Sequence, residues 1–315
     1  MIAFLFPGQG SQFVGMGKAL AERWPAARAL FEEADRVLGL PLNRLMWEGP
    51  EDKLRQTEFT QPALFVASVA AARVLGELGI KPAVTAGHSL GEYSALAAAG
   101  ALEFEAGLRA VRERGKLMEE AGREAPGGMA ALLGMSPEGV SALCAEVANG
   151  RVCQPVNFNA PDQIVIAGDR SAIEEAVRLA PERGAKRALA LNVSGAFHSS
   201  LMSGAALRMK EVLEGVSFRE ARCPVVTNCD ARPTREPDEF RAKLTAQIDH
   251  PVLWERSIRA MREAGAELFV ETGPGHVLLG LLKRTDRSAR GLCTDEDPSL
   301  AHIMKEVNAC GFKGK

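Results

Sequence analysis

The sequence lacks several patterns that would place a protein outside the ordinary globular enzymes. None of its six cysteines forms a C-x-x-C pair, so neither a zinc site nor a dithiol redox motif is indicated. The 38 basic and 40 acidic residues nearly cancel, and a net charge of -2 predicts no binding to nucleic acid or to an anionic membrane. Hydrophobic residues make up 46% and charged residues 25%, which is typical of a packed globular chain.

Long hydrophobic runs are also missing. The apolar stretch at residues 2–6 stops at Pro7 and is too short for a signal peptide. No segment approaches the roughly 18 consecutive apolar residues of a membrane-spanning helix. The expected location is therefore the cytoplasm, where the six cysteines would stay reduced.

What is present is an alternation of short apolar strands with longer helices. Residues 2–6 and 83–86 predict buried strands, and residues 63–78 predict a buried helix that begins just after Pro62. Strands that alternate with helices indicate a parallel sheet covered by helices on its faces. The main fold class is therefore α/β, with a parallel sheet of the hydrolase type.

A different pattern of predicted strands and helices begins at Gly127-Gly128. It predicts strands and helices in the order βαββαβ, which is typical of a ferredoxin-like module; the ranges are 129–134, 136–148, 152–158, 163–167, 171–183 and 186–192. We therefore predict an α/β hydrolase-like core of residues 1–124 and 195–315. A ferredoxin-like subdomain of residues 125–194 is inserted into it.

The segment Gly87-His88-Ser89-Leu90-Gly91 has the pattern G-x-S-x-G. An apolar strand leads into it and a helix leaves it, which is the context of a nucleophile elbow. Flanking glycines relieve crowding in such a turn, and the helix N-terminus favours a developing oxyanion. Ser89 could instead be a simple helix cap. The strand–turn–helix context favours the nucleophile.

A serine hydroxyl needs a general base, and His198 is the leading candidate. It lies in a loop between a strand and a helix and follows the serine in chain order. His250 and His276 also lie in loops, so position alone leaves them open. No convincing third acid follows, because Asp162 and Asp169 sit in turns where aspartate is usually structural. Something other than a carboxylate is expected to orient His198.

Seven segments together resemble the malonyl-CoA:acyl-carrier-protein transacylases, a family related to the acyltransferase domains of polyketide synthases. They run from residue 4 to about 282 in the family's order. The segments are Phe6-Pro7-Gly8-Gln9-Gly10-Ser11-Gln12, Gln61-Pro62-Ala63, Gly87-His88-Ser89-Leu90-Gly91-Glu92-Tyr93-Ser94-Ala95, Arg114-Gly115-Lys116, Asn157-Phe158-Asn159, Gly195-Ala196-Phe197-His198 and Gly273-Pro274-Gly275.

The resemblance implies that Ser89 carries the acyl group and that His198 acts as its base. Arg114 would bind the free carboxylate of the malonyl group, for which a planar guanidinium is well suited. Arg109 and Arg112 lie in the same predicted helix and are its rivals. Without the resemblance, a solvated helix arginine would be the preferred interpretation of all three.

The resemblance also implies supporting roles. The main-chain N–H groups of Gln9 and Leu90 would form the oxyanion hole, and the main-chain carbonyl of Gln247 would orient His198. Asn157 would lie near the site. Phe197 would fill the space that an α-methyl group needs, which favours malonyl over methylmalonyl, although one methyl group is worth only about 1–3 kcal/mol.

The implied reaction is a ping-pong transfer of malonyl from malonyl-CoA to the phosphopantetheine thiol of acyl carrier protein in fatty-acid biosynthesis. The coenzyme A thioester is a substrate, and no metal or bound cofactor is expected. The acidic carrier predicts a basic docking patch, with candidates Lys186, Arg187, Lys283 and Arg284. A monomer is expected from the family.

Three alternatives stay open at this point. A serine thioesterase or other hydrolase would use the same serine and histidine but release free acid. A polyketide-pathway acyltransferase would carry a different acyl group. A non-catalytic carrier-binding subunit would keep the fold but form no covalent adduct. The complete set of Ser89, His198, Gln9 and Arg114 argues against the last.

Overall fold

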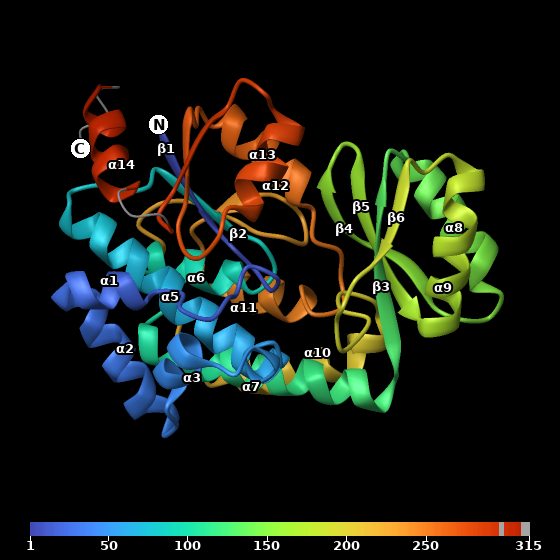
Figure 1. Cartoon of the computed structure of the whole chain (residues 1–315), viewed down its shortest axis with the longest axis horizontal. Helices are drawn as coiled ribbons and strands as arrows, with labels where there is room; N and C mark the ends of the chain where they lie inside the picture. Colours follow the sequence, from blue (N-terminus) through green and yellow to red (C-terminus); the bar gives the residue numbers. More distant parts are fainter. Residues whose placement is uncertain (296–298, 310–315) are drawn as a thin grey trace.

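Two β-sheets organise the chain in a computed structural model that describes residues 1–295 and 299–309 (Figure 1). The larger sheet has the order β10-β9-β1-β2-β7-β8, and the strands from β10 to β7 run parallel while β8 is antiparallel to β7. The strands are β1 (Ile2–Phe6), β2 (Val84–Gly87), β7 (Val225–Val226), β8 (Pro233–Thr234), β9 (Leu268–Glu271) and β10 (Arg290–Cys293). The predicted parallel sheet is confirmed.

Both faces of this sheet are buried beneath helices. Along β1, Phe4 and Phe6 contact the core on one face, whereas Ala3 and Leu5 contact the core on the other, as the two-residue period of a strand requires. The helices of this region are α1 (Lys18–Arg23), α2 (Pro25–Leu38), α3 (Leu42–Glu48), α4 (Glu51–Leu54), α5 (Thr57–Glu77), α6 (Gly91–Ala98), α7 (Phe104–Glu124), α10 (Ser203–Glu214), α11 (Pro237–Ala246), α12 (Trp254–Glu263), α13 (Val277–Thr285) and α14 (Ser299–Ala309).

Helix α5 corrects two expectations from the sequence, namely where this helix begins and that no segment is apolar enough to span a membrane. It begins at Thr57, so Pro62 lies inside the helix and not in its first turn. Pro62 has no N–H to donate to the Glu58 carbonyl, and this carbonyl instead accepts a hydrogen bond from Arg112 of α7. The helix is long and apolar enough to cross a membrane, with a mean hydropathy of 1.3 over an 18-residue stretch. However, 78% of that stretch is buried inside the protein. Burial of this kind is typical of a core helix.

The smaller sheet has the order β4-β5-β3-β6 and is antiparallel throughout. Its strands are β3 (Gly127–Leu133), β4 (Cys153–Ala160), β5 (Gln163–Asp169) and β6 (Arg187–Ala190). Helices α8 (Pro137–Ala148) and α9 (Arg170–Leu179) cover its outer face (Figure 1). This is the predicted ferredoxin-like arrangement. The helix predicted to reach residue 183 ends at Leu179, and a 3-10 turn containing Pro181 follows it.

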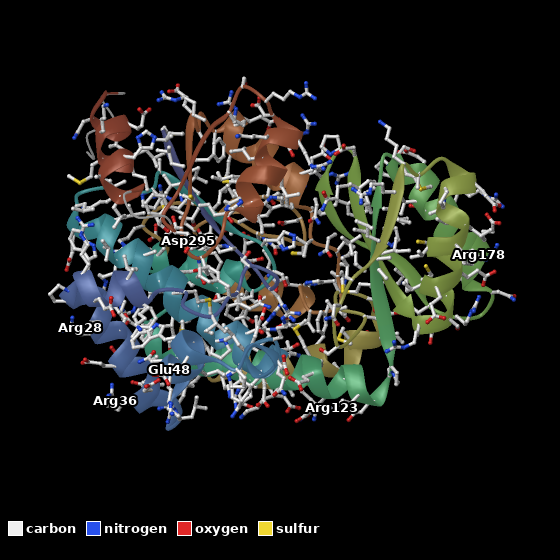
Figure 2. All side chains as sticks on the ribbon, viewed as in Figure 1. Arg28, Arg36, Glu48, Arg123, Arg178 and Asp295 are labelled. Atoms are coloured by element: carbon white, nitrogen blue, oxygen red, sulfur yellow. The ribbon has the colours of Figure 1, made fainter. Side chains whose placement is uncertain are left out.

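The inner face of the smaller sheet packs against the main core through residues such as Met129 and Val165. Helix α7 leads directly into β3 (Figure 1). The chain boundaries at 124/125 and 194/195 stay a prediction, while the sheet itself spans residues 127–190. Charged side chains such as Arg28, Arg36 and Arg178 project from the outer helices (Figure 2). Cys310 lies outside the described residues.

Candidate active site

The turn between β2 and α6 holds Ser89 in a left-handed conformation, with φ of 51°. Positions 87 and 91, two residues before and after it, require glycine because the backbone packs closely there. A Cβ on Gly87 would lie 1.9 Å from the carbonyl carbon of Gly91, and one on Gly91 would lie 2.1 Å from the Phe6 oxygen. The turn therefore has the geometry of a nucleophile elbow pressed against the end of β1.

His198 contacts the serine directly. Its Nε2 lies 2.8 Å from Ser89 Oγ, and its Nδ1 lies 2.7 Å from the main-chain oxygen of Gln247. A carbonyl oxygen only accepts, so Nδ1 carries the proton and Nε2 is left to accept from the serine. Burial, and then the nearby Arg114 charge, lower the pKa of His198 to about 3. The imidazole is therefore neutral near pH 7, as a general base must be.

Arg114 lies beside the serine and is 1% exposed. Its Nη2 donates to Ser89 Oγ over 3.1 Å and to Gln247 Oε1 over 2.8 Å, while Nη1 donates to Gln61 Oε1 over 2.8 Å. These acceptors are all uncharged. Burial lowers the pKa of Arg114, because desolvation disfavours its charged form. A buried guanidinium bonded to neutral groups is a natural site for an anion beside the serine.

The two rival arginines of α7 are used elsewhere. Arg109 forms an exposed ion pair with Glu105 at 2.9 Å. Arg112 forms an ion pair with the Glu58 carboxylate at 2.8 Å and also donates a hydrogen bond to the Glu58 main-chain oxygen. Their contacts leave Arg114 as the arginine that faces the serine.

Gln9 and Leu90 both line the cavity around Ser89. The register of the parallel strands brings them together, because Phe6 at the end of β1 pairs with Gly87 at the end of β2. In residues 1–295 and 299–309, neither main-chain N–H has a hydrogen-bond acceptor. Two such donors at one edge can stabilise an oxyanion. The Gln9 side chain donates to Thr57 Oγ1 over 3.3 Å.

The other candidate residues divide into lining and distant groups. Asn157 and Phe197 are buried and line the cavity. His250 and His276 are exposed, and the histidine that contacts the serine hydroxyl is His198. Asp162 pairs with Arg284 at 3.0 Å. Asp169 accepts from the Val152 N–H, so both aspartates have structural contacts.

Two residues that pack against the elbow were not predicted from the sequence to lie there. Asn228 Oδ1 accepts from the Ser89 N–H at 2.7 Å, and Asn228 Nδ2 donates to the Gly87 carbonyl at 2.7 Å. Glu92 is buried beneath the elbow, where desolvation raises its pKa to about 7. Glu92 lies in the segment of residues 87–95 that carries the resemblance, and an acid in an otherwise largely apolar helix was a signal of an unusual position. Asn228 carried no comparable signal, because only the fold brings β7 beside the elbow.

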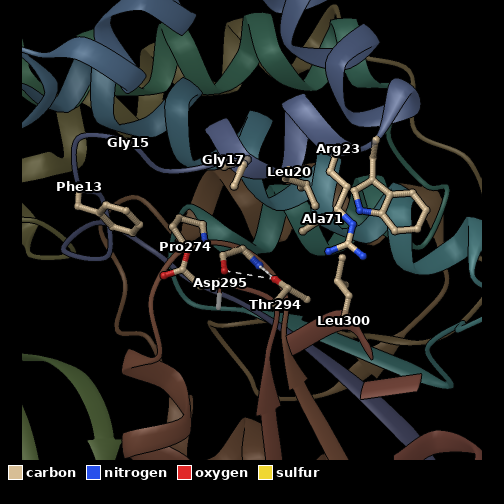
Figure 3. Close-up of a pocket in the computed structure, with 14 residues that line it drawn as sticks. Phe13, Gly15, Gly17, Leu20, Arg23, Ala71, Pro274, Thr294, Asp295 and Leu300 are labelled. Carbon is tan, nitrogen blue, oxygen red and sulfur yellow. Dashed lines mark hydrogen bonds between the residues drawn. The ribbon is translucent and has the colours of Figure 1, made fainter. Parts of the chain in front are cut away.

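The cavity that contains Ser89 has a volume of about 670 Å³ and is lined from both sheets, with Gln9 and Leu90 on one side and Met129 and Val165 on the other. That volume is in the range of small-molecule sites. A separate cavity of about 160 Å³ lies among Phe13, Leu20 and Pro274, shares no lining residue with the first and is much smaller (Figure 3).

The candidate docking residues lie outside the lining of the larger cavity. Lys186 and Arg187 are exposed at the start of β6, and Lys283 and Arg284 are exposed on α13. Arg284 bonds both carboxylate oxygens of Asp162, at 3.1 and 3.0 Å. That contact ties α13 to the β4–β5 turn and leaves the docking role a prediction.

The chain is similar to known proteins over nearly its whole length. The family described as "Acyl transferase domain" matches residues 3–307. The Malonyl CoA-acyl carrier protein transacylase of Bacillus subtilis (strain 168) is 46% identical over 311 residues, covering 98% of each chain.

Solved structures agree with the sequence match. An acyl carrier protein S-malonyltransferase from Vibrio cholerae has a TM-score of 0.93 at 43% identity, over 96% of this chain and 99% of that one. A malonyl-transacylase in complex with a type II PKS acyl-carrier protein has a TM-score of 0.94 at 43% identity, over 97% and 99%. The chain belongs to the acyl transferase family, within its malonyl-CoA:acyl-carrier-protein transacylase group.

Proposed function

We propose that this protein transfers a malonyl group from malonyl-CoA to the phosphopantetheine thiol of acyl carrier protein, in cytoplasmic fatty-acid biosynthesis. The observation that carries the proposal is the joint approach of two groups to one hydroxyl. Ser89 Oγ lies 2.8 Å from His198 Nε2 and 3.1 Å from Arg114 Nη2. A base and an anion-binding cation at one nucleophile suit an acyl group that itself carries a carboxylate.

In the first half-reaction, His198 Nε2 takes the proton of Ser89 as Oγ attacks the thioester carbonyl. The N–H groups of Gln9 and Leu90 receive the oxyanion. The carbon–sulfur bond then breaks, the coenzyme A thiolate takes the proton from His198, and malonyl remains as an ester on Ser89. In the second half-reaction His198 takes the proton of the carrier thiol as its sulfur attacks that ester. The bond to Ser89 Oγ then breaks, Oγ takes the proton from His198, and malonyl leaves as a thioester of the carrier.

Arg114 gives the proposal its substrate class. A malonyl carboxylate would pair with the buried guanidinium, whereas a simple acyl chain would leave that charge without an anion. Phe197, buried at the cavity wall, supports malonyl over methylmalonyl. The chain supplies nucleophile, base and cation itself, so the proposed chemistry needs no metal or resident cofactor. The thiols Cys144, Cys153 and Cys223 are unbridged, which suits a reducing compartment.

The carrier protein completes the proposed reaction as the second substrate. The exposed Lys186, Arg187, Lys283 and Arg284 remain our candidates for its docking surface. A hydrolase would use the same serine and histidine, but the buried arginine and the carbonyl that orients His198 favour transfer.

The test is to incubate the protein with malonyl-CoA and determine its intact mass, alongside Ser89→Ala. One malonyl adduct on the wild type, none on the variant, and discharge of the adduct by holo acyl carrier protein would support the proposal. Steady release of free malonate, unaffected by carrier, would establish a hydrolase. No adduct and no turnover would overturn the proposed substrate.

A further inference from the structure

A carboxylate beneath the elbow has no part in the reaction just described. Glu92 lies in the first turn of α6 and is 1% exposed. Its Oε2 accepts from Gln247 Nε2 at 2.7 Å and from the Asn228 N–H at 3.0 Å. A buried carboxylate is costly unless its hydrogen bonds are useful to the fold or to the site.

Gln247 is the residue through which Glu92 reaches the site. The main-chain oxygen of Gln247 accepts from His198 Nδ1, and its side-chain Oε1 accepts from Arg114 Nη2. Its Nε2 faces three oxygens, those of Glu92 at 2.7 Å, the Ser89 carbonyl at 2.9 Å and Asn228 at 3.3 Å. One glutamine therefore contacts the base, the cation and the elbow.

The two ends of that amide are not interchangeable. In the reverse orientation, Oε1 would face three oxygens and Nε2 would face the Arg114 guanidinium. Every contact would then place two acceptors or two donors against each other. An ionised carboxylate only accepts hydrogen bonds and therefore opposes the reverse orientation more strongly than a neutral group would. We propose that Glu92 is a positioning residue whose carboxylate fixes the Gln247 amide so that its oxygen holds Arg114 ready for the substrate carboxylate.

The charges around Glu92 agree with this role. Burial raises its pKa, while its bonds to Gln247 and Asn228 and the Arg114 charge lower it. The amide of Gln247 stands between the carboxylate and the guanidinium, with its N–H towards the anion and its oxygen towards the cation. The amide dipole is thus aligned between two buried charges, and a neutral side chain at position 92 would remove the negative charge that favours this alignment.

Glu92→Gln is the informative substitution, because it keeps the size and an oxygen acceptor but adds an N–H donor. The new donor can bond Gln247 Oε1, which permits the reverse amide and turns Nε2 towards Arg114. The main-chain carbonyl of Gln247 still holds His198 in either orientation. The loss should therefore be specific to an acyl group that carries a carboxylate.

The experiment compares two reagents at pH 8.5, where the Glu92 carboxylate of the wild type is ionised. One is malonyl-CoA, and the other is diisopropyl fluorophosphate, an uncharged reagent that phosphorylates activated serines. For Glu92→Gln we expect acylation by malonyl-CoA to slow about 10–100-fold, within the span of coupled hydrogen-bond networks, and phosphorylation of Ser89 to change less than about threefold. Equal losses with both reagents would show a general structural role and overturn the proposal.

A second variant tests whether Glu92 acts through Gln247. Gln247→Leu removes the amide, and it should itself slow malonyl transfer selectively. The double variant should be no slower than Gln247→Leu alone, because the carboxylate then has no amide to orient. Losses that multiply in the double variant would contradict the proposal. Phosphorylation also counts the folded sites in each sample, and a variant that no longer reacts with the fluorophosphate would likewise overturn it.

Glu271→Gln is the matched control. Glu271 is another fully buried carboxylate, with its pKa raised by burial to about 7, and it accepts the N–H groups of Leu278 and Leu279 at 3.0 and 2.9 Å. Its substitution should alter the two reaction rates by the same factor. The inference rests on the proposed function, but the two fail differently. A wild type without a malonyl adduct would reject the function, whereas equal losses in Glu92→Gln would reject only the role of Glu92.

Discussion

The regions around the two sheets differ in how closely their residues follow local backbone preferences, such as helix capping and negative φ. In the smaller sheet region, α8 has Ser136 as a cap that accepts from Gly139 N at 3.1 Å, and Pro137 in its first turn. In the larger region, Ser89 and His198 both adopt positive φ, at 51° and 64°. These two strained residues lie where the chemistry is proposed, whereas Asn149 of the smaller region has positive φ at the end of α8, where asparagine is commonly found in this conformation.

Burial of charge separates the regions in the same way. Arg114 and Glu92 are each 1% exposed, and both lie at the elbow of the larger region. The smaller region buries aliphatic residues such as Val140, Ile164 and Ile166 between its sheet and helices. Changes at the elbow should therefore affect reactivity. Changes in the outer core of the smaller module, which does not line the cavity, should affect mainly stability.

The largest contrast is expected between two glycines. Gly87→Ala places a Cβ 1.9 Å from the Gly91 backbone, so the elbow must shift. A shift of about 1 Å at a nucleophile costs on the order of 100-fold in rate, and we expect malonyl acylation to fall by at least that factor. Gly128→Ala in β3 meets nothing closer than 3.8 Å and should leave acylation within about twofold. Intact-mass time courses measure both. Equal losses would remove the distinction between the regions.

A smaller but more selective effect is expected for Arg114→Met. The variant keeps most of the buried volume and removes the cation, so a malonyl carboxylate would be left unpaired. Loss of one partner of a buried charge pair costs about 2–5 kcal/mol, or roughly 30-fold or more in kcat/KM for malonyl-CoA. Arg109→Met, at an exposed ion pair, should change this value less than about twofold. Steady-state kinetics with malonyl-CoA and acetyl-CoA would show whether the loss is confined to malonyl.

His198 predicts a pH dependence of stability. Its pKa is about 3 in the folded protein, against about 6.5 when unfolded. Between these values the unfolded chain binds more protons, so stability is lost as pH falls below 6.5. Over the interval down to pH 5 the loss is at most about 2 kcal/mol from this group. Urea unfolding of wild type and His198→Gln at pH 7.5 and 5 measures it, and the wild type should lose more. Equal losses would contradict the buried neutral imidazole.

The smallest effect is expected in the ferredoxin-like module. Ser136→Ala removes the side-chain cap of α8 and should lower the free energy of unfolding by about 1 kcal/mol. Ser136→Thr keeps a capping hydroxyl and should recover most of this. Neither substitution should change acylation of Ser89. A measurable fall in acylation would show that the module is coupled to the elbow more tightly than its contacts indicate.

The sequence predicted the elements with strong local patterns best. The strand at residues 2–6 and the end of the helix at residue 148 were both placed where the structure has them. The start of α5 was placed too late, because Pro62 suggests a first turn, whereas the helix continues through it and Arg112 bonds the Glu58 carbonyl. Tertiary contacts can override such a local signal.

The sequence by itself determined the elbow, the strand–helix alternation, the ferredoxin-like order and, through the matching segments, the residues that surround Ser89. These follow from short-range periodicity and from glycines that only a tight turn requires. Arg114 and the Gln247 carbonyl were implied only by the resemblance, since the residues by themselves left three arginines open and gave no partner for His198. Tertiary structure alone decided that Glu92 and Asn228 lie beneath the elbow. Those contacts join residues more than 100 positions apart in several cases, and no local pattern encodes a distance between segments that meet only when the sheet is assembled.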